Sequence, residues 1–354
     1  MSYADDTLKG ILDDVLSEYA NSGGKKVDSA VDEEDEEMRE IASESADVLL
    51  KRLKAKILEK LDASKGIEKE FEAAVFRTWR KPLNLLDLLL YLSLGVTSEF
   101  NSRQRRQRSS KTNCVQEALV DQHANACLVF NEIVHLLKSG FPSGAHSHWR
   151  ALHEIACVSY FISEHGEELA KRFLDYRAVE NYYQAQAIYE HQQRMECETL
   201  SKNDFKEIKK DFNKIKKRYG PDFVKKANYP YGWMPRSVLK TRSLKEIEKS
   251  VKLDMLRPFF DMASYNVHGG SKGLMFKLGF MKNKRKNVVV PVGPNNYGLA
   301  DPGKSAAISL GQVTACLLRA KTSFSNMVIV EALRSLVDEI CDAFCEIQAE
   351  FGEA

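Results

Sequence analysis

The sequence predicts an all-α fold, a multi-helix bundle with a long central helical hairpin. Apolar residues recur at helical spacing through most of the 354 residues, and the alternation typical of strands is almost absent. With 44% hydrophobic and 29% charged residues, the chain is able to bury a large globular core. The one candidate for a small β-hairpin lies near 274–292, where MFKLGFM and NVVVPV flank KNKRK.

The N-terminal segment 1–66 is predicted to be an acidic helical appendage, and 67–354 the helical core domain. Residues 1–40 hold 13 acidic and 4 basic side chains. Amphipathic helices are expected at 5–19 and 38–63, separated by the break NSGGKK and an acidic run. An amphipathic helix outside the core must dock on something, so we expect these helices to bind a protein partner or a second copy of the chain.

The core domain begins with a helix from about residue 67, and Pro82 favours a kink or a new helix start. A long helix over 114–139 stops at Gly140, and Pro142 opens the next helix, so the two form the hairpin. The remaining predicted elements are polar helices over 167–217, a loop rich in proline, glycine and aromatic residues over 219–236, a helix over 243–266, and one or two closing helices over 304–349.

Several classes of protein are disfavoured by the sequence. It has no run of 18 apolar residues, and its acidic start differs from a signal peptide, so we expect a cytoplasmic protein without membrane contact. The seven cysteines are scattered without a CxxC pair, as in reduced core thiols. We therefore expect no metal site and no cofactor.

A polar stripe on the otherwise apolar helix after GFPSG is the strongest functional signal. His146, Arg150, His153, Glu154 and Cys157 fall within an arc of about 100°. Charged side chains on a buried helix must be paired with opposite charges or take part in binding or catalysis. Two interpretations remain open: Arg150 and Glu154 form an intrahelical ion pair, or Arg150 offers its planar guanidinium to a phosphate or carboxylate while Glu154 and a histidine orient it.

His268 is the candidate long-range partner of Arg150. It lies in SYNVHGG, where two glycines end a helix and leave the imidazole at the C-terminal end; simple capping is the alternative. Tyr265 lies one turn earlier and would line the same space. The candidate catalytic residues are Arg150, Glu154, His268 and His153, and the candidate ligand-binding residues of this site are His146 and Tyr265.

Two basic segments predict further ligand-binding residues. They are NSRQRRQRSSK over 101–111 and KNKRK over 282–286, and the Lys-rich region 202–226 adds to the basic excess. Clustered positive charge favours RNA or another nucleic acid as a partner, although a solvated surface is the alternative for each segment. The side chains assigned to this role are Arg103, Arg105, Arg106, Lys284 and Arg285.

The letters GLADPGKS over 298–305 match a nucleotide-binding phosphate loop. A genuine loop follows a buried strand and begins a parallel α/β domain, whereas Pro302 stiffens this one and only about 50 residues follow it. We interpret the match as accidental.

Four motifs in order carry a family resemblance over about residues 70–315: FRTWRKPLNLLDLLL, LKSGFPSGAHSHWRALHEIA with HGEELAKRFLDY, ASYNVHGG and GPNNYGLADP. They resemble a bacterial, mostly helical family of unknown function linked to abortive-infection and HEPN-type proteins. The resemblance implies a defence-associated or RNA-directed protein, since HEPN nucleases cleave RNA without metal using Arg and His four to six residues apart. None of the eight histidines here follows an arginine at that spacing. A composite of Arg150, Glu154 and His268 would have to substitute.

Two functional hypotheses follow. The first is a bacterial defence or toxin-type protein whose buried Arg/His/Glu site binds a phosphate-bearing ligand and acts as a metal-independent ribonuclease. The second is a non-catalytic helical scaffold that oligomerises or docks on a partner.

Overall fold

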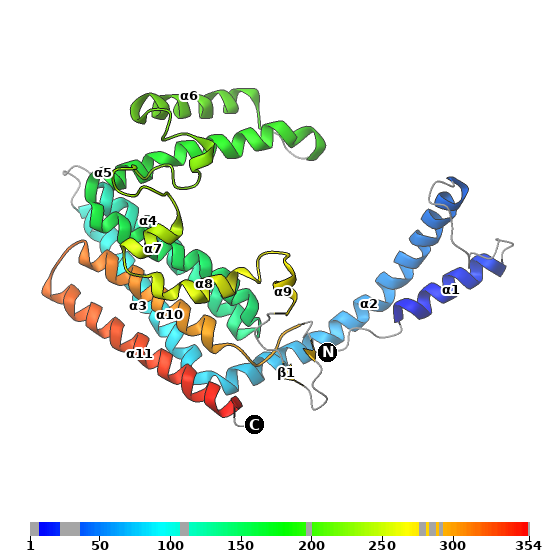
Figure 1. Ribbon diagram of the computed structural model, residues 1–354. Helices are drawn as coiled ribbons and strands as arrows, with labels where there is room; N and C mark the ends of the chain where they lie inside the picture. Colours follow the sequence, from blue (N-terminus) through cyan, green and yellow to red (C-terminus); the bar gives the residue numbers. More distant parts are fainter. Residues whose placement is uncertain are drawn as a thin grey trace. The chain divides into compact units, whose positions relative to one another are not determined.

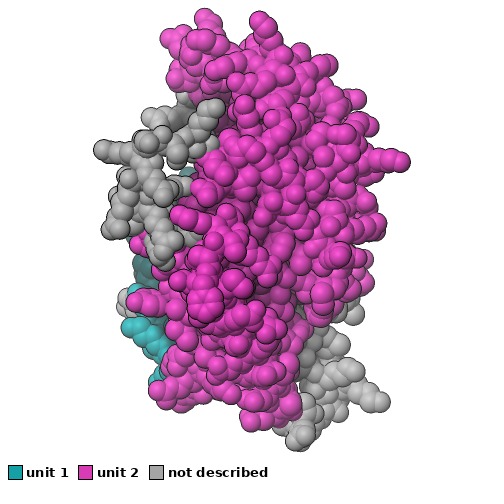
Figure 2. Space-filling model, turned by 90° about the vertical axis from the view of Figure 1, so that its left-hand side faces the viewer, with its two compact units in different colours: residues 1–74 teal, residues 75–354 magenta. Residues whose placement is uncertain are grey.

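The computed structural model of the chain describes residues 7–21, 36–106, 113–195, 200–275, 281–282, 288–289 and 293–352. Within these residues the fold is an all-α multi-helix bundle, which confirms the predicted fold class (Figure 1). The chain divides into two compact units, residues 1–74 and 75–354, coloured separately in Figure 2. The sequence prediction places the boundary earlier, after residue 66.

The first unit contains α1 (Thr7–Asn21) and most of α2 (Glu36–Thr78). Arg52 of α2 donates a hydrogen bond to Glu18 of α1 at 2.6 Å. The prediction of separate helices at 38–63 and from residue 67 is wrong, because α2 is continuous. The glycine at position 66 lowers helix stability by about 1 kcal/mol but removes no backbone hydrogen bond, so the helix continues through it.

Trp79 joins α2 to α3 (Arg80–Arg106) and is fully buried. Its indole Nε1 donates to Oδ1 of Asn296 at 2.9 Å, and its ring centroid lies 5.7 Å from that of Phe344. Pro82 lies in the first turn of α3, where a missing backbone donor costs no helical hydrogen bond. Asn296 belongs to the motif GPNNYGLADP, so this part of the motif has a structural role.

The predicted central hairpin is confirmed as α4 (Cys114–Lys138) and α5 (Pro142–Met195). Between them Gly140 has a φ of 76°, which is unfavourable for other residues. The Phe141 amide donates to the Leu136 carbonyl at 2.8 Å, the bond that defines a Schellman motif at a helix C-terminus. The glycine therefore both ends α4 and reverses the chain.

Gly166 interrupts α5 with non-helical dihedrals of φ 76° and ψ −157°. The sequence prediction ends the polar-stripe helix at this residue, and the break confirms it. The part of α5 after Gly166 packs against α6 (Lys202–Tyr219), and these are the polar helices predicted over 167–217.

Short elements follow α6. They are η1 (Lys226–Asn228), α7 (Leu244–Ser250), η2 (Asp254–Leu256), α8 (Arg257–Ser264) and α9 (Ser271–Met275). The single helix predicted over 243–266 is wrong. Lys252 adopts a left-handed φ of 58°, and a proline in the first turn of α8 requires a new helix start. The predicted hairpin is present as two-residue strands, β1 (Met281–Lys282) and β2 (Val288–Val289), which pair antiparallel.

The buried helix α10 (Ala300–Arg319) contacts α3, α4, α5 and α11 (Phe324–Gly352), as Figure 1 shows. The Thr314 hydroxyl contacts Nε2 of His123 in α4 at 3.0 Å and donates to Ser93 of α3 at 3.1 Å. The alanine, serine and glycine residues of α10 allow the neighbouring helices to approach closely. In the described part of the chain, no helix combines the length and the apolar character that a membrane span requires.

The segment that matches a phosphate loop mostly forms the first turns of α10. Gly303 is buried, and a Cβ atom at that position would lie 2.3 Å from the Phe344 ring. The residues described before α10, from 293 onward, form no strand. Gly303 therefore serves close packing, and the phosphate-loop match is accidental, as the sequence analysis concludes.

Candidate functional site

Trp149 fixes the direction in which α5 presents its polar stripe. The side chain is fully buried and its Nε1 donates to the Ser309 hydroxyl of α10 at 2.9 Å. The rings of His146 and His153 lie 5.7 and 5.2 Å from the indole, measured between centroids. With Trp149 held against α10, the polar residues beside it face α7, α8 and the loop before α7.

Glu248 of α7 is the centre of the polar cluster. Its side chain is fully buried, and one carboxylate oxygen lies 3.0 Å from Nε2 of His153. The other oxygen accepts two hydrogen bonds from Arg257, at 2.7 Å from Nε and a second from a terminal nitrogen. Arg257 also lies 3.6 Å from Asp261. A buried carboxylate is tolerated when it is paired and hydrogen-bonded in this way, so these contacts tie α5, α7 and α8 together.

Arg150 stacks on Phe260 of α8, with its guanidinium carbon 4.8 Å from the ring centroid. Arg257 stacks on the same ring at 4.7 Å. Nε of Arg150 is buried, and no acceptor among the described residues bonds to it. Among the ion pairs of the described residues, none joins Arg150 to Glu154, so the predicted intrahelical pair is not formed. Arg150 is thus a guanidinium held by cation–π contact and without a carboxylate partner.

Glu154 instead accepts a hydrogen bond of 2.5 Å from the hydroxyl of Tyr231. Burial, followed by the neighbouring Glu154 carboxylate, raises the pKa of Tyr231 above its usual range. Tyr231 therefore remains a neutral donor that fixes the carboxylate. It comes from the loop predicted over 219–236, and the sequence analysis did not assign it to the site.

His146 is fully buried, and no hydrogen-bond partner of either ring nitrogen is found in the described structure. Burial lowers the pKa of its imidazole to about 4, and the Asp301 charge opposes this shift only in part. His146 is therefore held neutral against Trp149 and is not exposed to a ligand in solution.

Three side chains could supply donors to a metal ion. The nearest donor atoms of His153, Cys157 and Glu248 all lie within 4.8 Å of one another, and imidazole, thiolate and carboxylate are the ligands of zinc. Two features oppose a dication here: the Glu248 charge is already paired with Arg257, and the unpaired guanidinium of Arg150 lies on the ring that Arg257 also contacts. We assign these donors to a hydrogen-bonded cluster.

The structure brings only some of the predicted site residues together. His268 is exposed and takes part in none of the contacts described for Arg150. Tyr265 accepts a hydrogen bond from Lys272 at 2.7 Å. The residues that do contact the α5 stripe are Glu248, Phe260 and Tyr231, with Arg257 bound to Glu248, and the sequence pattern assigns none of them to the site. Their ordinary spacing within short helices and a loop gives no periodic signal.

The predicted basic-segment residues are not tested by the structure. Arg103, Arg105 and Arg106 belong to the last turns of α3, but their side chains lie outside the described part of the chain. Lys284 and Arg285 also lie outside the described residues.

Glu248→Gln is expected to lower the free energy of unfolding by about 3–5 kcal/mol, because Arg257 would lose its buried counter-charge. Glu246→Gln on the same helix is the control. Glu246 is partly exposed and pairs only with Lys249, at 2.9 Å, so about 0.5 kcal/mol or less is expected. Urea unfolding followed by circular dichroism measures both. Equal effects of the two variants would show that Glu248 does not hold the cluster together.

The buried histidines predict that acid destabilises the fold. His123 and His146 each have a folded pKa of about 4, lowered by burial from 6.5. The unfolded state takes up their protons first, so stability is full above pH 6.5 and falls as the pH drops toward 4. Each histidine contributes a slope of up to about 1.4 kcal/mol per pH unit.

His146→Phe tests this, because phenylalanine keeps the ring contact with Trp149 without the titratable group. The variant is expected to show a pH slope shallower by up to about 1.4 kcal/mol per unit over that window. Urea unfolding at several pH values gives the slope. An unchanged slope would mean that His146 is as easily protonated in the folded chain as in the unfolded one.

Comparison with known proteins gives one match. No curated protein and no solved structure is found to match the chain. Residues 116–286 match the sequence model of DUF5677, described as a family of unknown function. This range contains most of α4 and all of α5 to α9, and thus Arg150, Glu154, Tyr231, Glu248 and Phe260. The matched family is uncharacterised, as the sequence resemblance implies, and the polar cluster lies within the segment that this chain shares with it.

Proposed function

We propose that this chain is a bacterial, cytoplasmic, HEPN-like defence protein whose polar cluster binds a phosphate group of an RNA ligand without a metal ion. The observation that carries the proposal is Arg150. Its guanidinium is held on Phe260, its Nε is buried without an acceptor, and it has no carboxylate partner among the described residues. A buried donor without an acceptor is costly, and a phosphate would supply bidentate, charge-assisted hydrogen bonds.

The neighbouring residues support anion binding in an ordered way. Arg257 adds a second guanidinium on the same ring, and Glu248 holds it in place. Tyr231 holds the Glu154 carboxylate by a hydrogen bond, and that carboxylate makes no ion pair with Arg150. Arg150 is therefore a guanidinium without a direct ion-pair partner among the described residues.

Phosphate binding has more support than RNA cleavage. Metal-independent cleavage needs a histidine within hydrogen-bond reach of the reacting hydroxyl. His153 is fully buried, and its Nε2 is occupied by Glu248, whereas His268 is exposed. RNA cleavage is the narrower form of the proposal. In this form His153 acts as the general base after ligand binding separates its imidazole from Glu248.

Arg150→Ala is expected to weaken binding of inorganic phosphate and of RNA at least tenfold, since a charge-assisted hydrogen bond contributes about 1.5–3 kcal/mol. Arg150→Lys should restore binding only in part, because an ammonium lacks the planar fork. Titration calorimetry with added chelator measures the affinity. Arg334→Ala is the control, since Arg334 is 72% exposed and pairs with Glu331. Unchanged affinity in Arg150→Ala would refute the site.

One observation favours the second hypothesis, a helical scaffold that self-associates. The long helix α2 exposes apolar side chains within an arc of about 100°, with Leu50, Ile57 and Leu58 exposed by 49, 38 and 61%. Apolar groups exposed along one helix are typical of a protein-binding surface.

Leu58→Glu is expected to convert a self-associated form to monomer, because a carboxylate at a buried interface is strongly unfavourable. Light scattering during gel filtration measures the molar mass. Lys56→Glu on the opposite side of the same helix is the control, since it changes charge outside this face without removing an apolar side chain. A wild-type chain that is monomeric at every accessible concentration would exclude self-association through α2.

A further inference from the structure

The apolar face of α6 is already used within the fold. The Phe212 ring stacks on Tyr182 of α5 at 4.1 Å and the Phe205 ring on Tyr189 at 4.9 Å, measured between centroids. Phe212 and Ile215 are buried. In Figure 1, α6 lies alongside the second half of α5. Insertion of α6 into a membrane or into the groove of a partner would need this same face, so neither use is open to it.

Another face of α6 is rich in exposed lysines. The helix contains eight basic and three acidic residues. At about 100° per residue, six exposed lysines fall within an arc of about 120° that contains no acidic residue. We call this set the lysine face: Lys202, Lys206, Lys209, Lys210, Lys216 and Lys217. Among the ion pairs of the described residues, only Lys210 of this set takes part in one, with Glu207 at 3.5 Å.

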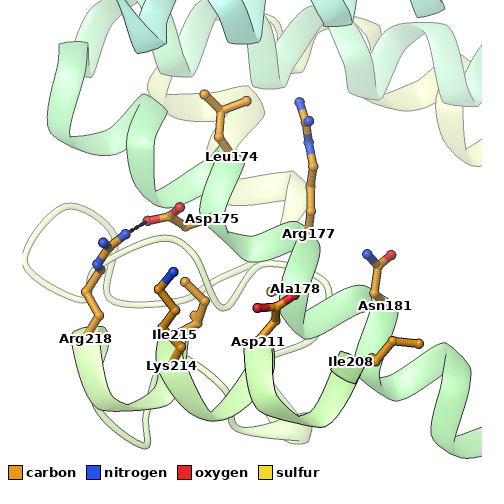
Figure 3. A pocket seen from close by; sticks show the side chains of 10 residues that line it. All are labelled: Leu174, Asp175, Arg177, Ala178, Asn181, Ile208, Asp211, Lys214, Ile215 and Arg218. Carbon is orange, nitrogen blue, oxygen red and sulfur yellow. Dashed lines mark hydrogen bonds and ion pairs between the residues drawn. The ribbon is translucent and has the colours of Figure 1, made fainter. Parts of the chain in front are cut away.

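The acidic residues of α6 lie along one edge of the helix. Asp211 lines a pocket of about 280 Å³ between α5 and α6, together with Arg177 and Lys214 (Figure 3). On the α5 side of this pocket, Asp175 accepts hydrogen bonds of 2.7 Å each from Arg218 and Tyr219. Asp175 and Asp211 thus lie at the pocket, Glu207 pairs with Lys210, and the other five lysines of the lysine face have no ion pair among the described residues.

The length and composition of the lysine face fit a chain of phosphates. From Lys202 to Lys217 the helix rises about 22 Å, which is long enough to contact several successive phosphates of a nucleic-acid strand. Protein interfaces are depleted of lysine and depend on apolar and aromatic anchors, whereas non-specific nucleic-acid binding depends on charge alone. The lysine face carries no apolar anchor, so a polyanion fits it better than a protein surface does.

We propose that the lysine face of α6 binds the phosphodiester backbone of RNA without reading its sequence. The inference rests on the proposed function, because it takes RNA as the ligand class. In this proposal α6 supplies the affinity for the RNA chain, and Arg150 recognises a single phosphate.

The test replaces Lys206, Lys209, Lys210 and Lys217 by glutamine, which removes the charge and keeps an unbranched polar side chain of similar helix propensity. Binding of a single-stranded RNA is measured by fluorescence anisotropy at several salt concentrations. Each lost phosphate contact lowers the slope of log affinity against log salt by about 0.7 for single strands. The variant is therefore expected to lose roughly three units of slope and at least tenfold in affinity, with an unchanged melting temperature.

The matched control replaces the same number of exposed lysines on another helix, Lys51, Lys54, Lys56 and Lys69 of α2, and should retain the slope. A lysine-face variant that keeps the wild-type slope overturns the inference. If Arg150→Ala loses phosphate binding in that case, the proposed function stands without the lysine face. Loss of RNA binding in the lysine-face variant alone, with Arg150→Ala unchanged, supports α6 and refutes the Arg150 site. Equal, lysine-dependent binding of polyglutamate would overturn RNA as the ligand and indicate an acidic protein.

Discussion

The buried carboxylate of Glu248 is the interaction on which the candidate site depends. The charge is tolerable only because His153 and Arg257 contact its two oxygens, and these residues belong to α5 and α8. The helices α7 and α8 have 7 and 8 residues, too short to be stable as isolated helices. Their positions are therefore set by such tertiary contacts. Once α8 is placed, Phe260 lies where the Arg150 guanidinium stacks on it.

A second constraint comes from α10, which determines how α5 is rotated. Ser309 of α10 accepts the hydrogen bond of Trp149, and Thr314 contacts α3 and α4. Helices can approach α10 this closely because Gly303 and its alanines leave room, as the Phe344 ring at the Gly303 backbone shows. Arg150 and His153 are three residues apart and therefore share a helix face. With Trp149 held against α10, this face lies toward α7 and α8.

The two proposed binding features have different chemistry. Arg150 is a single, partly buried guanidinium whose Nε lacks an acceptor, an arrangement suited to one phosphate at a defined position. The lysine face of α6 is extended and exposed, an arrangement suited to many phosphates at no fixed register. A compact guanidinium would fix the position of one phosphate and an extended basic surface would supply affinity that depends on salt, so the two proposed features would be complementary in an RNA-binding protein.

The sequence by itself determined the all-α class, the α4–α5 hairpin and the face of α5 that carries the site, because helical periodicity and the glycine and proline signals are local. It also identified Arg150, His153 and Glu154 from their spacing on that face. Only the tertiary structure decided their partners. Glu248, Arg257 and Phe260 lie on short elements after a left-handed turn at Lys252, and Tyr231 lies in a loop, so no periodic pattern links them to α5. The environment of Arg150 also depends on tertiary contacts, because Tyr231 hydrogen-bonds to Glu154, and the guanidinium stacks on Phe260 without an ion pair among the described residues.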